Sequence, residues 1–303
     1  MTSKKRLLIA AEVDRTLLDR VRGDARFDVV HSPTADETSL AATVGEAEIL
    51  VTRYHNKVTS RVLDAATRLE LIIQGTSGLD NIDLDAAARR GIRVLGLPGE
   101  NANAVAELVI GHMIALTRTV PAYDAMMRAG VWQREDCATR RELRGYCAGI
   151  VGLGRVGGRV AHLARAFGVE VHAYDPYVAA ADRATLDELL ASSEILTLHV
   201  PLTDETRRMI GARELDRLPR GAFVINTSRG EVLDAAALLD RLASGHLAGA
   251  ALDVYDEEPP RGVVWPEDRR LILTPHIAGC SAESKASIGR LIYERICEFC
   301  DSG

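Results

Sequence analysis

The chain has 303 residues, of which 47% are hydrophobic and only 4% aromatic, so we expect two domains with aliphatic α/β cores rather than an aromatic-rich β-sandwich. Its net charge of -6, with no long run of Lys or Arg, argues against a nucleic-acid partner. We find neither a signal-peptide core nor an apolar stretch of about 18 residues, which argues against a membrane partner and predicts a cytoplasmic location.

Short aliphatic and β-branched runs alternate with helical stretches along the chain, a pattern typical of βα units around parallel sheets. The first set of predicted strands covers residues 7–10, 28–31, 49–52, 71–74 and 93–95. A long helix follows at about 102–116. We interpret the irregular stretch after it, with Trp132 and the charged segment 134–144, as the link between two domains.

The second set of predicted strands covers residues 148–151, 170–174, 195–199, 223–226, 249–253 and 271–274, and a helix from about residue 282 closes the chain. Five scattered cysteines predict reduced thiols rather than a disulfide framework. Cys297 and Cys300 are three residues apart in the last predicted helix, so we expect them to share one packed face rather than form a redox pair.

A glycine motif lies between the predicted strand 148–151 and a predicted helix at 156–167. Gly152, Gly154 and Gly157 form G-x-G-x-x-G, in which the glycines allow a tight turn, close approach to a pyrophosphate and tight packing of helix on strand. The positive end of the helix dipole would then face the phosphates. This context predicts a dinucleotide site.

Asp175 follows the next predicted strand, 18 residues beyond Gly157. A carboxylate at about this spacing accepts hydrogen bonds from the adenosine ribose and repels a 2′-phosphate, which favours NAD over NADP. One alternative stays open, because methyltransferases that use S-adenosylmethionine also combine a glycine-rich turn with an acidic residue.

Ligands of open parallel sheets bind outside the carboxyl ends of the strands, and this chain carries polar residues at several of those ends. Arg229, a carboxylate at Glu257 or Glu258, and His276 would face the nicotinamide there. Arginine matches a substrate carboxylate and polarises the adjacent carbonyl, and histidine can exchange a proton with the reacting oxygen. The trio therefore predicts carbonyl reduction.

Four ordered motifs resemble the D-isomer-specific 2-hydroxyacid dehydrogenases. They are G-L-G-R-V-G at 152–157, N-T-S-R-G at 226–230, D-V-Y-D-E-E-P at 253–259 and T-P-H-I-A-G at 274–279. By this resemblance Arg229, Glu258 and His276 are the catalytic residues. The implied reaction is hydride transfer between NAD and C2 of a small 2-oxo or 2-hydroxy acid.

The resemblance also implies the binding residues. The cofactor set is Gly152, Gly154, Arg155, Val156, Gly157, Asp175, Val200, Pro201, Thr206, Thr227, Asp253 and Gly279, and the substrate set is Arg53, Ser77, Gly78, Arg229 and His276. Thr76 occupies a position where family members commonly have glycine, which affects the expected shape of the substrate loop.

The implied fold is a Rossmann NAD-binding domain, residues 99–281, inserted in a flavodoxin-like substrate domain, residues 1–98 plus 282–303. Hinges are expected at 97–99 and 278–279, with closure excluding water. The helix near 102–116 and the following arm would form a homodimer contact. We expect no extra regulatory domain after residue 303, and therefore no feedback through one.

Within the family the chain is most similar to the catalytic part of 3-phosphoglycerate dehydrogenases, chiefly through Arg53 and the run 81–91. Arg53 with His55 and Lys57 could meet an anionic substrate tail. A hydroxypyruvate or glyoxylate reductase is equally compatible with the trio. The alternative from another class is an NAD-sensing binding protein of the corepressor type, without significant turnover.

Overall fold

The computed structural model describes residues 4–34, 36–135, 140–183, 185–261, 263 and 265–301. The chain forms two compact units, Met1–Asn101 with Cys280–Gly303 (unit 1) and Ala102–Gly279 (unit 2). The divisions between them fall at 101/102 and 279/280. Each unit is a parallel α/β domain, which confirms the predicted fold class.

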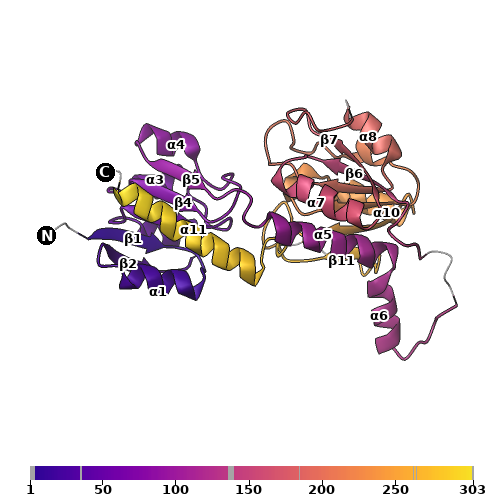
Figure 1. The fold of residues 1–303 in the computed structure, drawn as a ribbon, viewed down its shortest axis with the longest axis horizontal. Helices are drawn as coiled ribbons and strands as arrows, with labels where there is room; N and C mark the ends of the chain where they lie inside the picture. Colours follow the sequence, from indigo (N-terminus) through magenta and orange to yellow (C-terminus); the bar gives the residue numbers. More distant parts are fainter. Residues whose placement is uncertain are drawn as a thin grey trace. The chain divides into compact units, whose positions relative to one another are not determined.

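Unit 1 contains a five-stranded parallel sheet of order β2-β1-β3-β4-β5 (Figure 1). Its strands are β1 (Lys5–Ile9), β2 (Phe27–His31), β3 (Ile49–Thr52), β4 (Leu71–Gln74) and β5 (Arg93–Gly96). The chain adds β2 on one side of β1 and the later strands on the other. The topological switch point of unit 1 therefore lies between β1 and β3, where open sheets of this type bind ligands.

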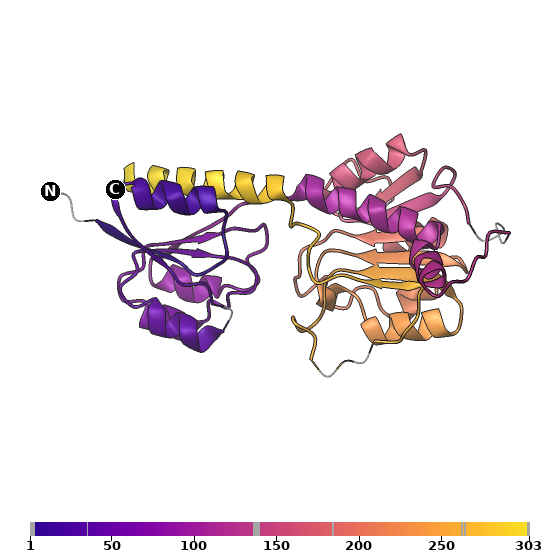
Figure 2. The same cartoon turned by 90° about the horizontal axis from the view of Figure 1, so that it is seen from below.

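Helices cover both faces of this sheet, as Figure 2 shows. On one face lie α1 (Arg15–Gly23) and α11 (Ala282–Asp301), and on the other lie α2 (Glu37–Thr43), α3 (Ser60–Ala65) and α4 (Leu84–Arg89). Alternate strand residues point to opposite faces of the sheet. Ile49 and Val51 pack with α1 and α11, whereas Leu50 packs with α2, α3 and α4. This double burial explains the near-continuous apolar strands, since each buried aliphatic side chain contributes about 1.5–3 kcal/mol.

Unit 2 contains a six-stranded parallel sheet of order β11-β10-β9-β8-β6-β7. Its strands are β6 (Cys147–Val151), β7 (Glu170–Tyr174), β8 (Ile195–Leu198), β9 (Ala222–Asn226), β10 (Leu247–Leu252) and β11 (Leu271–Leu273). Strand order reverses between β6 and β8, which makes the end of β6 the switch point of this unit.

The helices of unit 2 also form two layers (Figure 2). The first is α5 (Ala102–Thr117) with α7 (Arg155–Ala166), and the second is α8 (Leu186–Ser192), α9 (Ala212–Leu215) and α10 (Ala235–Ala243). A further helix, α6 (Val120–Arg128), buries none of its residues within the unit, and a short 3₁₀ turn, η1, spans Gly230–Val232.

The structure corrects the interpretation of the stretch around Trp132 and 134–144 as a link between domains. Residues 136–139 lie outside the described part of the chain, but Leu143 and Tyr146 are buried in the core of unit 2 beside Val109 of α5. This burial ties the charged segment to unit 2, within which the whole stretch falls. The structure also shows α6, which we did not expect.

The other predicted elements are confirmed with shifts of at most two residues at their ends; the largest are at β1, which begins at Lys5 rather than 7, and at β10, which begins at Leu247 rather than 249. Cys300 packs against the core of unit 1, and the Cys297 sulfur accepts a 3.0 Å hydrogen bond from the Arg26 guanidinium.

Within the described residues no single helix is long and apolar enough to cross a membrane; α5 and α6 reach that threshold only as a pair, with a 64° bend between them.

Candidate active site

The glycine turn of unit 2 is shaped by the packing of the chain on itself. Gly152 has a φ of 89°, and a Cβ there would lie 2.7 Å from the carbonyl oxygen of His199. A Cβ on Gly157 would collide with the carbonyl oxygen of Gly152. A Cβ on Gly154, by contrast, would meet no described atom within 4 Å. The first and third glycines are thus required by the fold, and the second leaves space beside the turn.

That space lies at the N-terminus of α7, which begins at Arg155 with Gly154 as its N-cap. The first turn of α7 contains no acidic side chain, so its partial positive charge is not neutralised from within the helix. Gly157 and Val160 pack into the core and hold this end of the helix at the sheet. A helix terminus at a topological switch point is a binding site for a pyrophosphate, and the residues present fit one.

Asp175 follows β7 and lies beside the glycine turn. Its carboxylate accepts hydrogen bonds from the backbone amides of Leu153, at 2.8 Å, and Tyr177, at 2.9 Å. These two bonds use part of the four-site acceptor capacity of a carboxylate. The remaining capacity suits ribose hydroxyls, and the fixed negative charge disfavours a phosphate at the same place.

The segment after β8 carries three of the expected cofactor residues, Val200, Pro201 and Thr206. The Thr206 hydroxyl donates to the carbonyl of Pro201 at 2.6 Å and accepts from the amide of Thr203 at 2.8 Å, which closes a compact turn. His199, at the start of this segment, pairs with the Thr197 hydroxyl at 2.9 Å. Burial lowers the pKa of His199 to about 3, so this imidazole is neutral at physiological pH.

His276 and Glu258 form the most direct contact among the predicted catalytic residues. Nδ1 of His276 lies 2.6 Å from Oε2 of Glu258, and Oε1 of Glu258 accepts a 3.1 Å bond from the backbone amide of Tyr255. Both side chains are largely shielded, with 21% and 24% of their surface exposed. Glu257 instead approaches Arg261 at 3.8 Å, so Glu258 is the carboxylate that orients the imidazole.

The backbone around His276 is held in an uncommon conformation, with a φ of 53°. The fully buried carboxylate of Asp253 accepts three hydrogen bonds from this loop, from Thr274 Oγ1 at 2.6 Å, Ile277 N at 2.9 Å and Ala278 N at 2.8 Å. The His276 amide also donates to the carbonyl of Asp253 at 2.8 Å. Asp253 therefore fixes the direction in which His276 projects.

Arg229 lies on the loop after β9. Asn226 holds this loop: its side-chain oxygen accepts from the amide and hydroxyl of Ser228, at 3.0 and 2.8 Å, and its amide donates to the carbonyl of Arg229 at 2.8 Å. A Cβ on Gly230 would collide with the backbone of Tyr255, so the Arg229 loop lies directly against the segment that leads to Glu258. Arg229, Glu258 and His276 thus follow three neighbouring strands at one edge of the sheet.

Thr227 provides an independent sign of a ligand. Its hydroxyl oxygen is buried and has no hydrogen-bond partner among the described residues. An unpaired buried hydroxyl is costly, by about 1–3 kcal/mol, and a polar group of a bound cofactor would remove that cost. Together with the space beside Gly154, this observation fits a dinucleotide lying along the carboxyl edge of the sheet.

The remaining predicted substrate residues lie in unit 1. Arg53 follows β3 and its Nε is buried without a partner among the described residues. On the loop after β4, the Ser77 hydroxyl accepts from the amide of Gly99 at 3.2 Å, and the carbonyl of Gly78 accepts from the hydroxyl of Thr76 at 3.4 Å. Burial, and then the charge of Arg53, lowers the pKa of His55. Gly279, the last expected cofactor residue, ends unit 2.

Two residues that shape the site were not singled out from the sequence. Asn226 holds the Arg229 loop, and Tyr255 donates to the carbonyls of Thr274 and Leu252 at 2.9 and 3.2 Å. Burial raises the pKa of Tyr255 to about 12, so its hydroxyl stays a donor. The positions of both residues at strand ends could have indicated such roles.

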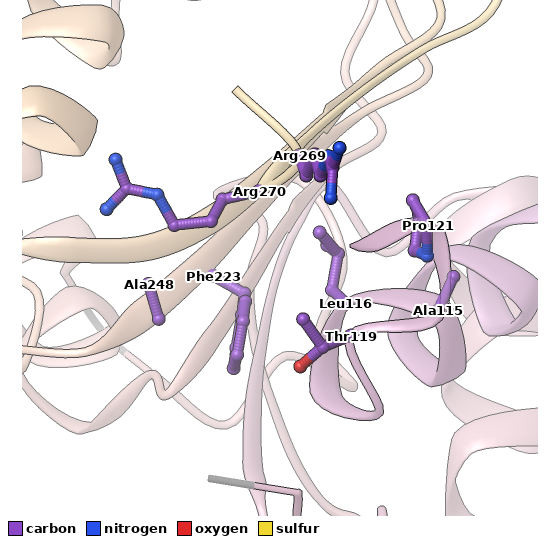
Figure 3. A pocket seen from close by; sticks show the side chains of 8 residues that line it. All are labelled: Ala115, Leu116, Thr119, Pro121, Phe223, Ala248, Arg269 and Arg270. Atoms are coloured by element: carbon purple, nitrogen blue, oxygen red, sulfur yellow. The ribbon is translucent and has the colours of Figure 1, made fainter. Parts of the chain in front are cut away.

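A cavity of about 280 Å³ lies at the opposite edge of the same sheet (Figure 3). It is lined by Ala115, Leu116, Thr119, Pro121, Phe223, Ala248, Arg269 and Arg270. Phe223 and Ala248 are the second residues of β9 and β10, and both arginines precede β11. The cavity is thus at the amino ends of the strands, away from the candidate active site.

Comparison with known proteins agrees with this geometry. Residues 110–278 match the model of the D-isomer specific 2-hydroxyacid dehydrogenase, NAD binding domain. The chain is 37% identical to D-3-phosphoglycerate dehydrogenase of Archaeoglobus fulgidus, over 96% of this chain and 56% of that protein. It is 36% identical to D-3-phosphoglycerate dehydrogenase of Escherichia coli K12, over 99% of this chain and 76% of that protein. It therefore spans about half to three quarters of the length of these relatives.

A solved structure is similar to this chain over nearly its whole length. D-lactate dehydrogenase from Aquifex aeolicus, in complex with NAD and lactic acid, superposes with a TM-score of 0.86 at 26% identity, over 98% of this chain and 96% of that one.

Proposed function

Because the chain belongs to the D-isomer specific 2-hydroxyacid dehydrogenases, we propose that it transfers a hydride between NAD and C2 of a small 2-oxo or 2-hydroxy acid. The observation that carries the proposal is the 2.6 Å contact between His276 and Glu258, on a loop beside that of Arg229. Since the matched family model is an NAD-binding domain, the methyltransferase alternative is set aside.

In this proposal His276 exchanges a proton with the oxygen on C2. NADH, when bound, supplies the hydride to the carbonyl carbon. Nδ1 of His276 is engaged by Glu258, and Nε2 is the nitrogen that we propose donates a proton to the developing alkoxide, or removes it from the hydroxyl in the reverse direction. Glu258 orients the ring for this exchange, through its 2.6 Å contact with Nδ1.

Arg229 is the proposed partner of the substrate carboxylate. Its planar guanidinium can bind a carboxylate through two parallel hydrogen bonds and polarise the neighbouring carbonyl. Asn226 fixes the backbone of Arg229, so the guanidinium projects from a defined loop. In unit 1, Ser77 and Gly78 are proposed to offer backbone amides to the substrate.

The cofactor residues that we propose are those expected from the sequence. Gly152, Gly154, Arg155, Val156 and Gly157 would hold the pyrophosphate, and Asp175 the adenosine ribose. The rest of NAD would contact Val200, Pro201, Thr206, Thr227, Asp253 and Gly279. The unpaired hydroxyl of Thr227 supports this assignment most directly.

The proposed substrate class includes 3-phosphohydroxypyruvate, hydroxypyruvate and glyoxylate. Arg53, with its buried unpaired Nε, is the proposed contact for an anionic tail. Burial lowers the pKa of His55, which favours the uncharged ring, so Lys57 is the proposed second cation. A phosphorylated substrate would make more use of these residues than glyoxylate.

We further propose a cytoplasmic homodimer without nucleic-acid or membrane partners. Its contact would involve α5 and α6, where Ile114, Val120 and Met127 are exposed by 36%, 49% and 54% and α6 buries no residue within unit 2. The net charge of -6 gives no basis for attraction to nucleic acid. Light scattering of the purified chain tests the dimer.

The deciding experiment measures oxidation of NADH by the purified chain against a panel of 2-oxo acids, phosphorylated and unphosphorylated, with NADPH in parallel. We expect turnover with NADH, and a higher kcat/KM for acids with a negatively charged tail than for glyoxylate. NADH binding without turnover on the whole panel would overturn the proposal.

A further inference from the structure

Unit 1 contains a buried polar network beneath the two loops that carry the proposed substrate contacts. Thr52 ends β3 and Gln74 ends β4; the two residues are paired in the sheet, and both are fully buried. Asn56, on the loop after β3, is 1% exposed, and Asn81 lies on the segment after β4. These four residues form the network.

Gln74 links the two strands to the loop after β4. Its Oε1 accepts from the Thr52 hydroxyl at 2.6 Å, and its Nε2 donates to Oδ1 of Asn81 at 2.7 Å and to the carbonyl of Gly78 at 3.3 Å. Both protons of the Gln74 amide are therefore used. The carbonyl of Gly78 belongs to the loop proposed to bind the substrate carboxylate.

Asn81 and Asn56 hold the main chain of Arg53 from both sides. Nδ2 of Asn81 donates to the carbonyls of Arg53 and Asn56, at 3.2 and 2.6 Å. Oδ1 of Asn56 accepts from the amide of Arg53 at 2.8 Å, while its Nδ2 donates to the carbonyls of Ala10, at 2.9 Å, and Thr34. Both backbone polar groups of Arg53 are thus bonded to side-chain amides. Its backbone is fixed, and its side chain is the part that can change conformation.

Stability alone does not account for this arrangement. The preceding residues of β3 and β4 are aliphatic and buried, and aliphatic side chains at positions 52 and 74 would avoid the desolvation of a hydroxyl and an amide. A buried polar network is at best nearly neutral relative to an apolar core, but it specifies one geometry. It lies, moreover, at the carboxyl edge beside the switch point, where the fold places ligands.

We infer that Gln74 and Asn81 are positioning residues that set the affinity for the acid substrate, by fixing the backbones of Arg53 and Gly78 relative to each other. The inference rests on the proposed function. Because the network is built from uncharged side chains, it maintains this geometry without adding a negative charge near an anionic ligand.

The test is Asn81→Asp, which keeps the shape of the side chain but places a carboxylate oxygen against the carbonyls of Arg53 and Asn56. We expect the KM for the preferred 2-oxo acid to rise about tenfold or more, the effect of losing one to two buried hydrogen bonds. The Kd for NADH, measured by fluorescence, should stay within about twofold of wild type, since the proposed cofactor residues lie in unit 2.

Two variants of Thr52 test the same inference if Asn81→Asp does not fold. Thr52→Val removes only the donor to Gln74 and should raise KM by a few-fold; Thr52→Ser, which retains the hydroxyl, should restore it. Thr67→Val is the matched control, because Thr67 donates to the carbonyl of Gly45 at 3.1 Å in the loop that precedes β4, at the opposite edge. It should leave KM unchanged.

An unchanged KM in Thr52→Val and in folded Asn81→Asp, with thermal stability lowered, would overturn the inference and assign the network a purely structural role. A wild type that binds NADH but reduces no acid on the panel would instead overturn the proposed function, and the inference with it.

Discussion

The carboxyl edges of the two sheets fix their loops by different chemistry. In unit 2 carboxylates make most of these contacts: Asp253 binds the His276 loop, Glu258 binds the imidazole and Asp175 binds the glycine turn, while the amide of Asn226 holds the Arg229 loop. In unit 1 the corresponding loops are held by the neutral amides of Gln74 and Asn81. Charged anchors suit a region proposed to exchange a proton and to bind a ribose, whereas neutral anchors suit a region proposed to receive the anionic tail of a substrate.

The largest expected effect is on the charged edge, at His276. In His276→Ala the proton donor is lost while the proposed cofactor contacts remain, so turnover should fall by about 10²- to 10⁴-fold with little change in NADH affinity. Steady-state kinetics and NADH titration together measure this separation. His162→Ala is the control, because His162 is an exposed histidine of the same unit. Wild-type turnover in His276→Ala would refute the assigned role.

The second effect concerns acid stability. Because the pKa of His199 is lowered to about 3, the unfolded chain binds a proton below its usual pKa of about 6.5 while the folded chain does not. The free energy of unfolding therefore decreases as pH falls below about 6.5. At pH 5 the decrease due to His199 is about 2 kcal/mol.

His199→Gln should remove this pH dependence, so the free energy of unfolding should decrease less between pH 7 and pH 5 than in wild type. Urea unfolding at several pH values in this range measures it. The same substitution at the exposed His162 should leave the slope unchanged. A slope identical to wild type in His199→Gln would mean that the folded chain protonates this ring as readily as the unfolded chain does.

A smaller effect is expected at Asp175. Asp175→Asn keeps an oxygen for the amide of Leu153 but removes the charge that would repel a 2′-phosphate. The preference for NADH over NADPH should fall by about tenfold, close to 1.4 kcal/mol. The ratio of kcat/KM for the two cofactors measures it. A wild type that already prefers NADPH would contradict this interpretation.

The sequence was sufficient to predict both sheets because buried parallel strands are nearly continuous aliphatic runs, as in Ile49–Thr52 and Leu71–Gln74. It missed α6, a helix of nine residues, although Pro121 lies in its first turn, a favourable position for proline. The short helix and the charged stretch that follows it led us to interpret that region as a link.

Motif order was enough to identify the family, and the match to its NAD-binding domain confirms it. The choice between Glu257 and Glu258 was open from spacing alone, since adjacent residues differ only in the direction of their side chains. The network of Gln74 and Asn81 was beyond sequence reasoning, because its members are brought together by sheet register rather than by a motif.

Thr227 carries the smallest expected effect. Its hydroxyl is buried without a partner among the described residues, so Thr227→Val should leave the free energy of unfolding unchanged or raise it by up to about 1 kcal/mol. If the hydroxyl meets the cofactor, the Kd for NADH should nevertheless rise by a few-fold, or about 0.5–1.5 kcal/mol. Thr227→Ser, which keeps the hydroxyl, should bind NADH as wild type does. A rise in stability with no change in Kd would remove Thr227 from the cofactor site, while leaving the roles of His276 and Glu258 to their own tests.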